Sequence, residues 1–157
     1  MQWNWLRVGV AGLLSAASAA RAQGVEQLLD KALAGEHRAE ANRKRDQYRH
    51  PRETLLFFGL KPDMKVVEIW PGGGWYAEIL APFLRDKGRY YAAHFHIDDK
   101  TVEAYRNSRV AFQEKVARDS TLYGRVVITS VRAPEQTALA PRGSLDLVLT
   151  FRNVHNW

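Results

Sequence analysis

The stretch that most constrains the fold is residues 66–80, VVEIWPGGGWYAEIL, in which an apolar run leads into three consecutive glycines. The run from Lys65 to Trp70 is typical of a strand buried on both faces of a parallel sheet. Glycine has no Cβ, so the backbone at 72–74 can turn tightly and lie close to a ligand. A glycine-rich turn between a strand and a helix is where open α/β sheets bind nucleotide-like ligands.

Strand-like and helix-like segments alternate through the second half of the chain, after a helical first part. This order predicts an α/β fold with a Rossmann-like parallel sheet covered on both faces. Such sheets normally continue past the switch point, so we expect the domain to be truncated after the fourth strand. The predicted strands are residues 65–70, 88–95, 125–131 and 144–151, and the predicted helices are 74–86 and 98–119, the latter capped by Asp98 or Asp99.

The first part of the chain divides into a leader and a helical region. Residues 1–22 contain one early arginine, then VGVAGLLSAASAA, then small residues at Ala20 and Ala22. This pattern predicts a signal peptide cleaved after Ala22, and therefore an exported, periplasmic protein with no membrane span after cleavage. The absence of cysteine suits that compartment. Residues 23–62 then form a predicted N-terminal helical region, ahead of a partial Rossmann-like domain at 63–157.

The charge of the chain is mild. The formal net charge is +6, and residues 1–22 hold two arginines and no acid, which leaves +4 for the remainder. The densest basic run, residues 37–52, is interleaved with acids and is interpreted as a solvated helix face. We therefore expect no nucleic-acid partner.

Two classes of ligand compete for the glycine turn. Gly72, Gly74 and Ala77 fit the loose dinucleotide fingerprint G-x-G-x-x-G/A. That hypothesis leaves Glu68 unexplained, because a carboxylate would face a negative pyrophosphate. It also requires an acid for the ribose at the end of the second strand, where this chain has His94.

Residues 68–74, EIWPGGG, resemble motif I of class I S-adenosylmethionine-dependent methyltransferases, whose usual form is E/D-x-G-x-G-x-G. Residues 45–157 also resemble a group of predicted exported methyltransferase-like proteins with a VEIWPGGGWY signature. The resemblance implies a methyltransferase-type fold, S-adenosylmethionine as cofactor and methyl transfer to a small molecule. It places Glu68 near the cationic end of the cofactor, where a carboxylate is electrostatically favoured.

The resemblance also implies a set of site residues. Trp70 stands in place of the first motif glycine, and His94 in place of the ribose-binding acid. Asp98 and Asp99 lie a few residues later, and Glu135 is a weak candidate for the adenine amine. His155 is a weak candidate for a catalytic base. The implied cofactor-binding residues are Glu68, Trp70, Gly72, Gly73, Gly74, Trp75, His94 and Asn153.

Other interpretations stay open. His94, His96 and Asp98 have metal-binding side chains, but three positions along one strand edge give poor tetrahedral geometry, so no metal site is predicted. Export removes the protein from the compartment in which S-adenosylmethionine is made. The alternatives are therefore a non-catalytic envelope ligand-binding protein and, less favoured, a nicotinamide-dependent oxidoreductase.

Overall fold

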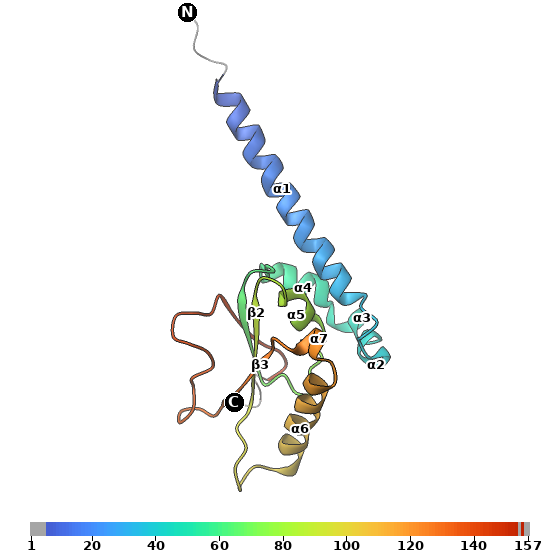
Figure 1. Cartoon of the computed structure of the whole chain (residues 1–157), viewed down its shortest axis with the longest axis vertical. Coiled ribbons are helices and arrows are strands. Elements are labelled where there is room, and N and C mark those ends of the chain that lie inside the picture. The colour runs from blue at the N-terminus through green and yellow to red at the C-terminus, as the bar shows by residue number, and fades with distance from the viewer. Residues whose placement is uncertain (1–5, 154, 156–157) are drawn as a thin grey trace, which may run out of the picture.

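The computed structural model describes residues 6–153 and 155, and the side chains of residues 20–153 and 155. It contains a four-stranded, all-parallel sheet in the order β3-β2-β1-β4 (Figure 1). The mixed α/β, Rossmann-like class predicted from the sequence is confirmed, and each strand lies within three residues of its predicted limits. The strands are β1 Lys65–Ile69, β2 Arg89–Phe95, β3 Val127–Val131 and β4 Leu147–Thr150.

The central strand β1 pairs with both β2 and β4, Glu68 lying between Ala92 and Leu149. The chain steps outward from β1 to β2 and β3, and then returns to the other side of β1 for β4. The strand order therefore reverses between β1 and β4. Ligands of open α/β sheets bind outside the carboxyl ends of the strands at such a switch point.

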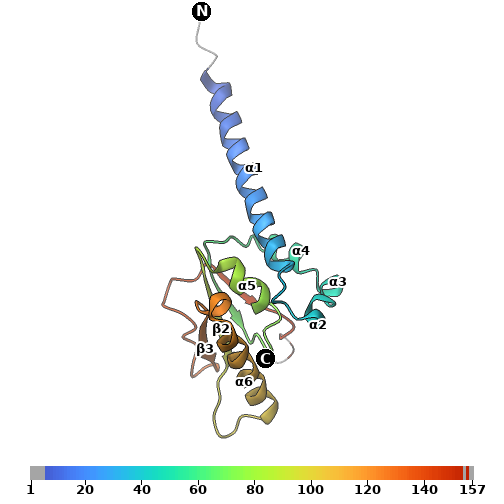
Figure 2. The same cartoon turned by 45° about the vertical axis from the view of Figure 1, so that its right-hand side comes forward.

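The helices cover only one face of the sheet. In Figures 1 and 2, α5 (Ala77–Leu84), α6 (Glu103–Arg118) and α7 (Ser120–Tyr123) lie on the same side of the strands. The prediction of helices on both faces is wrong for the described residues, because the connection 132–146 between β3 and β4 contains no helix. Its two prolines and Gly143 oppose helix formation. Val148 of β4 is accordingly 54% exposed.

The predicted N-terminal helical region, residues 23–62, is divided into several helices. The structure has α1 (Leu6–Leu33), α2 (Glu40–Arg43), α3 (Asp46–Arg49) and α4 (Pro51–Phe57). Arg38 explains the break, because its guanidinium is buried, donates to the Leu33 carbonyl at the end of α1, and pairs with Asp46 at 2.6 Å. The interpretation of residues 37–52 as a wholly solvated face is therefore wrong at Arg38.

The helix α1 packs against α4 and α5 through its C-terminal part and projects away from the domain through its N-terminal part (Figure 1). It runs across the predicted cleavage position after Ala22. Among the described residues, no helix combines the length and the apolar character needed to cross a bilayer.

The helix predicted to be capped by Asp98 or Asp99 begins at Glu103, and Val102 is its N-cap. The Asp98 carboxylate does not cap the helix. It accepts from the Lys100 amide at 3.0 Å and the Thr101 hydroxyl at 2.8 Å, which closes a tight turn before α6. The local hydrogen bonds of an aspartate thus compete successfully with helix formation.

Gly88, where α5 meets β2, provides a test of this packing. A Cβ at Gly88 would collide with the backbone carbonyl of Met64 and lie 2.8 Å from that of Pro62. Gly88→Ala should therefore lower the free energy of unfolding by about 2 kcal/mol or more. The matched control is Gly24→Ala in α1, where an added Cβ meets open space, so it should be neutral or slightly stabilising. Urea denaturation of both variants measures the difference, and equal stabilities would contradict the packing.

Candidate functional site

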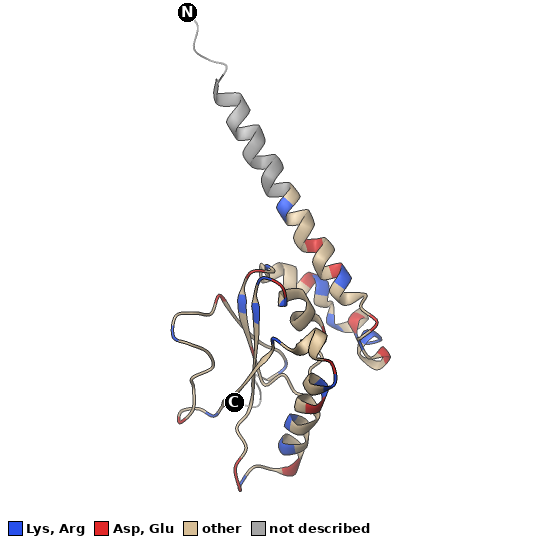
Figure 3. Ribbon diagram, viewed as in Figure 1, with Lys and Arg blue, Asp and Glu red and all other residues tan. Residues whose placement is uncertain are grey.

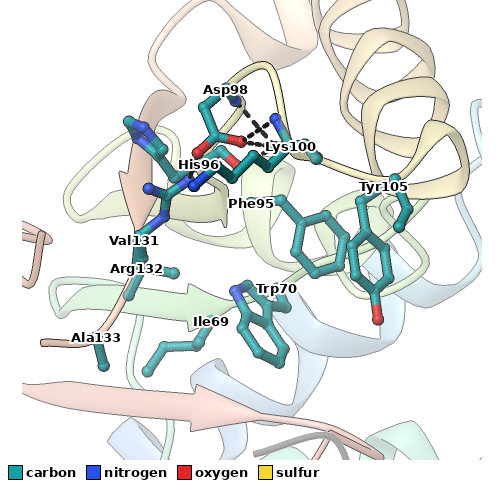
Figure 4. A pocket seen from close by; sticks show the side chains of 12 residues that line it. Ile69, Trp70, Phe95, His96, Asp98, Lys100, Tyr105, Val131, Arg132 and Ala133 are labelled. Carbon is teal, nitrogen blue, oxygen red and sulfur yellow. Dashed lines mark hydrogen bonds and ion pairs between the residues drawn. The ribbon is translucent and has the colours of Figure 1, made fainter. Parts of the chain in front are cut away.

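A pocket of about 780 Å³ opens at the carboxyl ends of β1, β2 and β3 (Figure 4). The end of β1 contributes Ile69 and the next residue, Trp70, and the end of β3 contributes Val131 and the next residue, Arg132. The loop after β2 and the start of α6 supply the remaining side. The complete lining is Ile69, Trp70, Phe95, His96, Asp98, Lys100, Thr101, Val102, Tyr105, Val131, Arg132 and Ala133.

The inner wall of the pocket is aromatic. The Phe95 ring stacks on Tyr105 at 4.3 Å between centroids, and Trp70 lies 5.2 Å from Phe95. The three side chains come from β1, β2 and α6 and converge in Figure 4. Flat, largely apolar walls of this kind suit a planar ring, which can stack on them while its polar edge meets the rim.

The backbone is strained where β1 and β4 end. Trp70 has φ 54° and Arg152 has φ 60°, in the left-handed region that favours glycine. The side-chain amide of Asn153 donates to the carbonyls of Ile69 and Trp70, at 3.2 and 3.3 Å, and holds this end of β1 in place. Strain of this sort costs roughly 1–3 kcal/mol per residue and clusters at functional sites.

The rim of the pocket is polar and carries both signs of charge. Arg132 forms an ion pair with Asp98, which joins the loops after β3 and β2. The hydrogen bond from Arg132, supported by Thr101, lowers the pKa of Asp98 to about 2, so this carboxylate is ionised at neutral pH. Lys100 and His96 lie beside this pair.

The glycine loop follows directly on Trp70. Gly72 and Gly74 have φ 57° and 80°, so both require glycine, and a Cβ on Gly74 would press on the Phe112 ring at 3.0 Å. Gly73 differs from them, because it is exposed and an added Cβ would meet open space. The backbone at Gly73 is therefore accessible to a ligand at short range.

His94 holds the glycine loop from the neighbouring strand. Its Nδ1 accepts from the Phe95 amide at 2.9 Å, so the proton is on Nε2, which donates to the Gly72 carbonyl at 3.0 Å. Burial lowers the pKa of His94 to about 4, which keeps the imidazole neutral. His94 does not line the pocket. The carboxylate that lines the pocket, from the loop after β2, is that of Asp98.

Glu68 is not among the residues that line the pocket. It is 3% exposed, and the Tyr90 hydroxyl donates to its carboxylate at 2.6 Å. Burial raises the pKa of Glu68 to about 7, although the Tyr90 hydrogen bond and the charge of Arg49 oppose the rise. A buried acid that is half ionised near neutrality responds strongly to any nearby charge.

Trp75 does not line the pocket either. It is buried beneath the N-terminal helices, where its indole Nε1 donates to the Asn42 carbonyl at 3.0 Å. The guanidinium groups of Arg49 and Arg38 lie 4.5 and 5.5 Å from its ring. This aromatic side chain anchors the N-terminal region to the start of α5 and does not form a wall of the pocket.

Of the remaining candidates, His155 and Glu135 are exposed. His96 and Asp98 line the pocket while His94 faces Gly72, and no three metal-binding side chains come together within the described residues. Sequence reasoning missed Phe95, Tyr105 and Arg132. Phe95 could have been identified as a site residue from its position at the end of a predicted strand, just before a turn. No sequence pattern marked Arg132.

No family model, curated protein or solved structure matches this chain.

The buried Glu68 generates a prediction about pH. Because its folded pKa is raised, native Glu68 keeps a proton that the unfolded chain releases, so its effect on stability becomes unfavourable as pH rises from about 4.5 to 7. The free energy of unfolding of Glu68→Gln should equal that of the parent protein near pH 4.5 and exceed it by about 3 kcal/mol at pH 8. Denaturant titrations across pH measure this, with Glu114→Gln on the exposed face of α6 as control. A Glu68→Gln effect that is equal at both pH values would contradict the assignment.

Proposed function

We propose that this protein binds S-adenosylmethionine in the pocket at the carboxyl edge of the sheet and transfers its methyl group to a small molecule. One observation carries the proposal. An aromatic wall and an ionised carboxylate beyond β2 line a pocket at the carboxyl ends of the strands, and Trp70 in that wall leads directly into the exposed glycine loop. An adenosyl group presents a flat ring and a ribose diol to such surroundings.

The residues present fit the parts of that cofactor. The wall formed by Trp70, Phe95 and Tyr105 can stack against a planar base. The Asp98 carboxylate already accepts from Lys100, Thr101 and Arg132, which leaves it room to accept one more hydrogen bond, from a ribose hydroxyl. Gly73 allows the chain to approach without a side chain in the way. The bound cofactor supplies an activated methyl group on a sulfonium.

The protein's task is then alignment and exclusion of water. His94 and Asn153 fix the loop and the end of β1 from both neighbouring strands, so the surface that orients a ligand is rigid before it binds. No described residue is assigned as a proton acceptor, and methyl transfer from a sulfonium to a nucleophile that is already deprotonated requires none.

Glu68 contributes through its charge. It is separated from the pocket-lining Trp70 by a single residue, and its pKa of about 7 lies where a neighbouring cation has most effect. A sulfonium nearby would favour the ionised carboxylate, so binding would draw a proton from Glu68. The neutral thioether of S-adenosylhomocysteine would not.

A second candidate, a phosphate-bearing dinucleotide, is favoured by one observation. Lys100, His96 and Arg132 bring basic groups to the rim beyond β2 and β3. Arg132 is already paired with Asp98, whose carboxylate would repel a phosphate at that point. The first proposal therefore takes precedence, and NAD and NADP serve as comparison ligands below.

Gly73 provides the direct test. Its φ is permissive and an added methyl meets no protein atom, so Gly73→Ala should keep the parent melting temperature without ligand. The same methyl should weaken S-adenosylmethionine binding about tenfold or more by displacing the ligand from the loop. Thermal shift and calorimetry measure both effects, with Gly24→Ala as control. Stabilisation by NAD or NADP alone would favour the second candidate. If Gly73→Ala bound S-adenosylmethionine as tightly as the parent protein, the glycine loop would not be part of the cofactor site.

The ionisation of Glu68 provides a test that separates the cationic ligand from the neutral one. Affinity for S-adenosylmethionine should rise with pH up to about 7, by at most about tenfold per pH unit, because the carboxylate must lose its proton. Affinity for S-adenosylhomocysteine should stay flat. In Glu68→Gln both profiles should be flat. A pH profile that survives this substitution would show that another group is responsible.

A further inference from the structure

A second surface lies at the edge of the sheet opposite the pocket, where the strands begin. Because the strands are parallel, the segments that precede them all lie at one edge, among them 58–64 before β1 and 85–88 before β2. The pocket lies at the other edge. In Figure 1, α1 projects from the side of the sheet where these segments lie, next to the end of α4.

Large apolar side chains are exposed at this edge. Phe57, the last residue of α4, is 85% exposed, and Phe58 beside it is 44% exposed. Their rings lie edge to face at 5.6 Å between centroids, and Leu28 of α1 is also exposed. Two adjacent exposed phenylalanines are unusual for a soluble surface and typical of a surface that meets an apolar phase.

Basic side chains surround this apolar group. Lys61, Lys87 and Arg21 line one shallow groove together with Leu28, in which Asp63 is the only acid. Figure 3 shows further basic segments where the strands begin. In the segments that lead into the four strands, six basic residues lie among three acids, one of which, Asp86, pairs with Arg85. These residues are Lys61, Lys65, Arg85, Lys87, Arg89 and Arg125, with Asp63, Asp86 and Asp146.

We infer that this edge, which we call the basic–aromatic face, docks on an anionic lipid surface. Phenylalanine side chains insert at the level of the headgroups, and lysines beside them attract anionic lipids. The apolar sequence of α1 leaves the domain on the same side. In a chain that keeps residues 1–22, an N-terminal segment associated with lipid would therefore bring Phe57 and Lys61 to the surface and turn the pocket away from it. The inference is independent of what the pocket binds.

The lack of cysteine allows a site-specific test on the full chain. Phe57→Cys, labelled with an environment-sensitive nitrobenzoxadiazole probe, is mixed with vesicles of equal parts phosphatidylcholine and phosphatidylglycerol. We expect a blue shift and a several-fold rise in emission as the probe enters the lipid. The matched control is Tyr48→Cys on α3, an exposed aromatic position away from the face, which should stay silent. Both proteins contain α1, so lipid attachment through α1 alone cannot produce the difference.

The basic residues are tested in the same background. Lys61→Gln with Lys87→Gln should weaken partitioning about fivefold for each lysine removed. Arg43→Gln with Lys44→Gln, two exposed cations at the C-terminal end of α2, should leave it unchanged. A silent probe at position 57, or equal responses at 57 and 48, would overturn the inference. So would equal responses to pure phosphatidylcholine vesicles, or a response to single-stranded RNA in place of vesicles.

Discussion

The hydrogen bond from His94 to the Gly72 carbonyl joins the central strand's glycine loop to the neighbouring strand, and the shape of the pocket depends on it. Gly72 and Gly74 supply the left-handed turns that the loop needs, but glycine by itself confers freedom and not a fixed shape. The imidazole fixes the loop on the β2 side, and Asn153 fixes the end of β1 on the β4 side. With both bonds in place, Trp70 is held in its strained conformation in the inner wall of the pocket.

Two buried titratable groups flank this arrangement and respond to pH in opposite directions. His94 is neutral in the fold, so the stability it contributes is lost as pH falls from about 6.5 to 4. Glu68 is protonated in the fold over much of the same range, and its effect on stability becomes unfavourable as pH rises toward 7. The two slopes oppose one another between pH 4.5 and 6.5. The pH dependence of the whole protein should therefore be weaker there than that of either single variant.

The sequence predicted the strands well because burial on both sides leaves a plain apolar record, as in KVVEI and RYYAAHF. The predictions were wrong where a single side chain determines where a helix ends or begins. Arg38 ends α1 from five residues away, and Asp98 takes Arg132, 34 residues later in the chain, in place of a helix cap. The glycine loop was correctly located. The partner of Glu68 was missed because Tyr90 lies on another strand, and only the register of β1 and β2, which no single sequence reveals, brings them together.

Because the strands are parallel, their beginnings lie at one edge of the sheet and their ends at the other. Each of the two proposed binding surfaces lies at one of these edges. Every connection that enters a strand lies at the edge with Phe57 and Lys61, and every loop that leaves β1, β2 or β3 lies at the edge with the pocket. Basic residues before the strands cost little there, since they stay solvated and lie away from the buried Glu68. A surface attachment at the first edge would leave the second open to solvent. Recognition of a surface and recognition of a small molecule can thus coexist in one small sheet without sharing a residue.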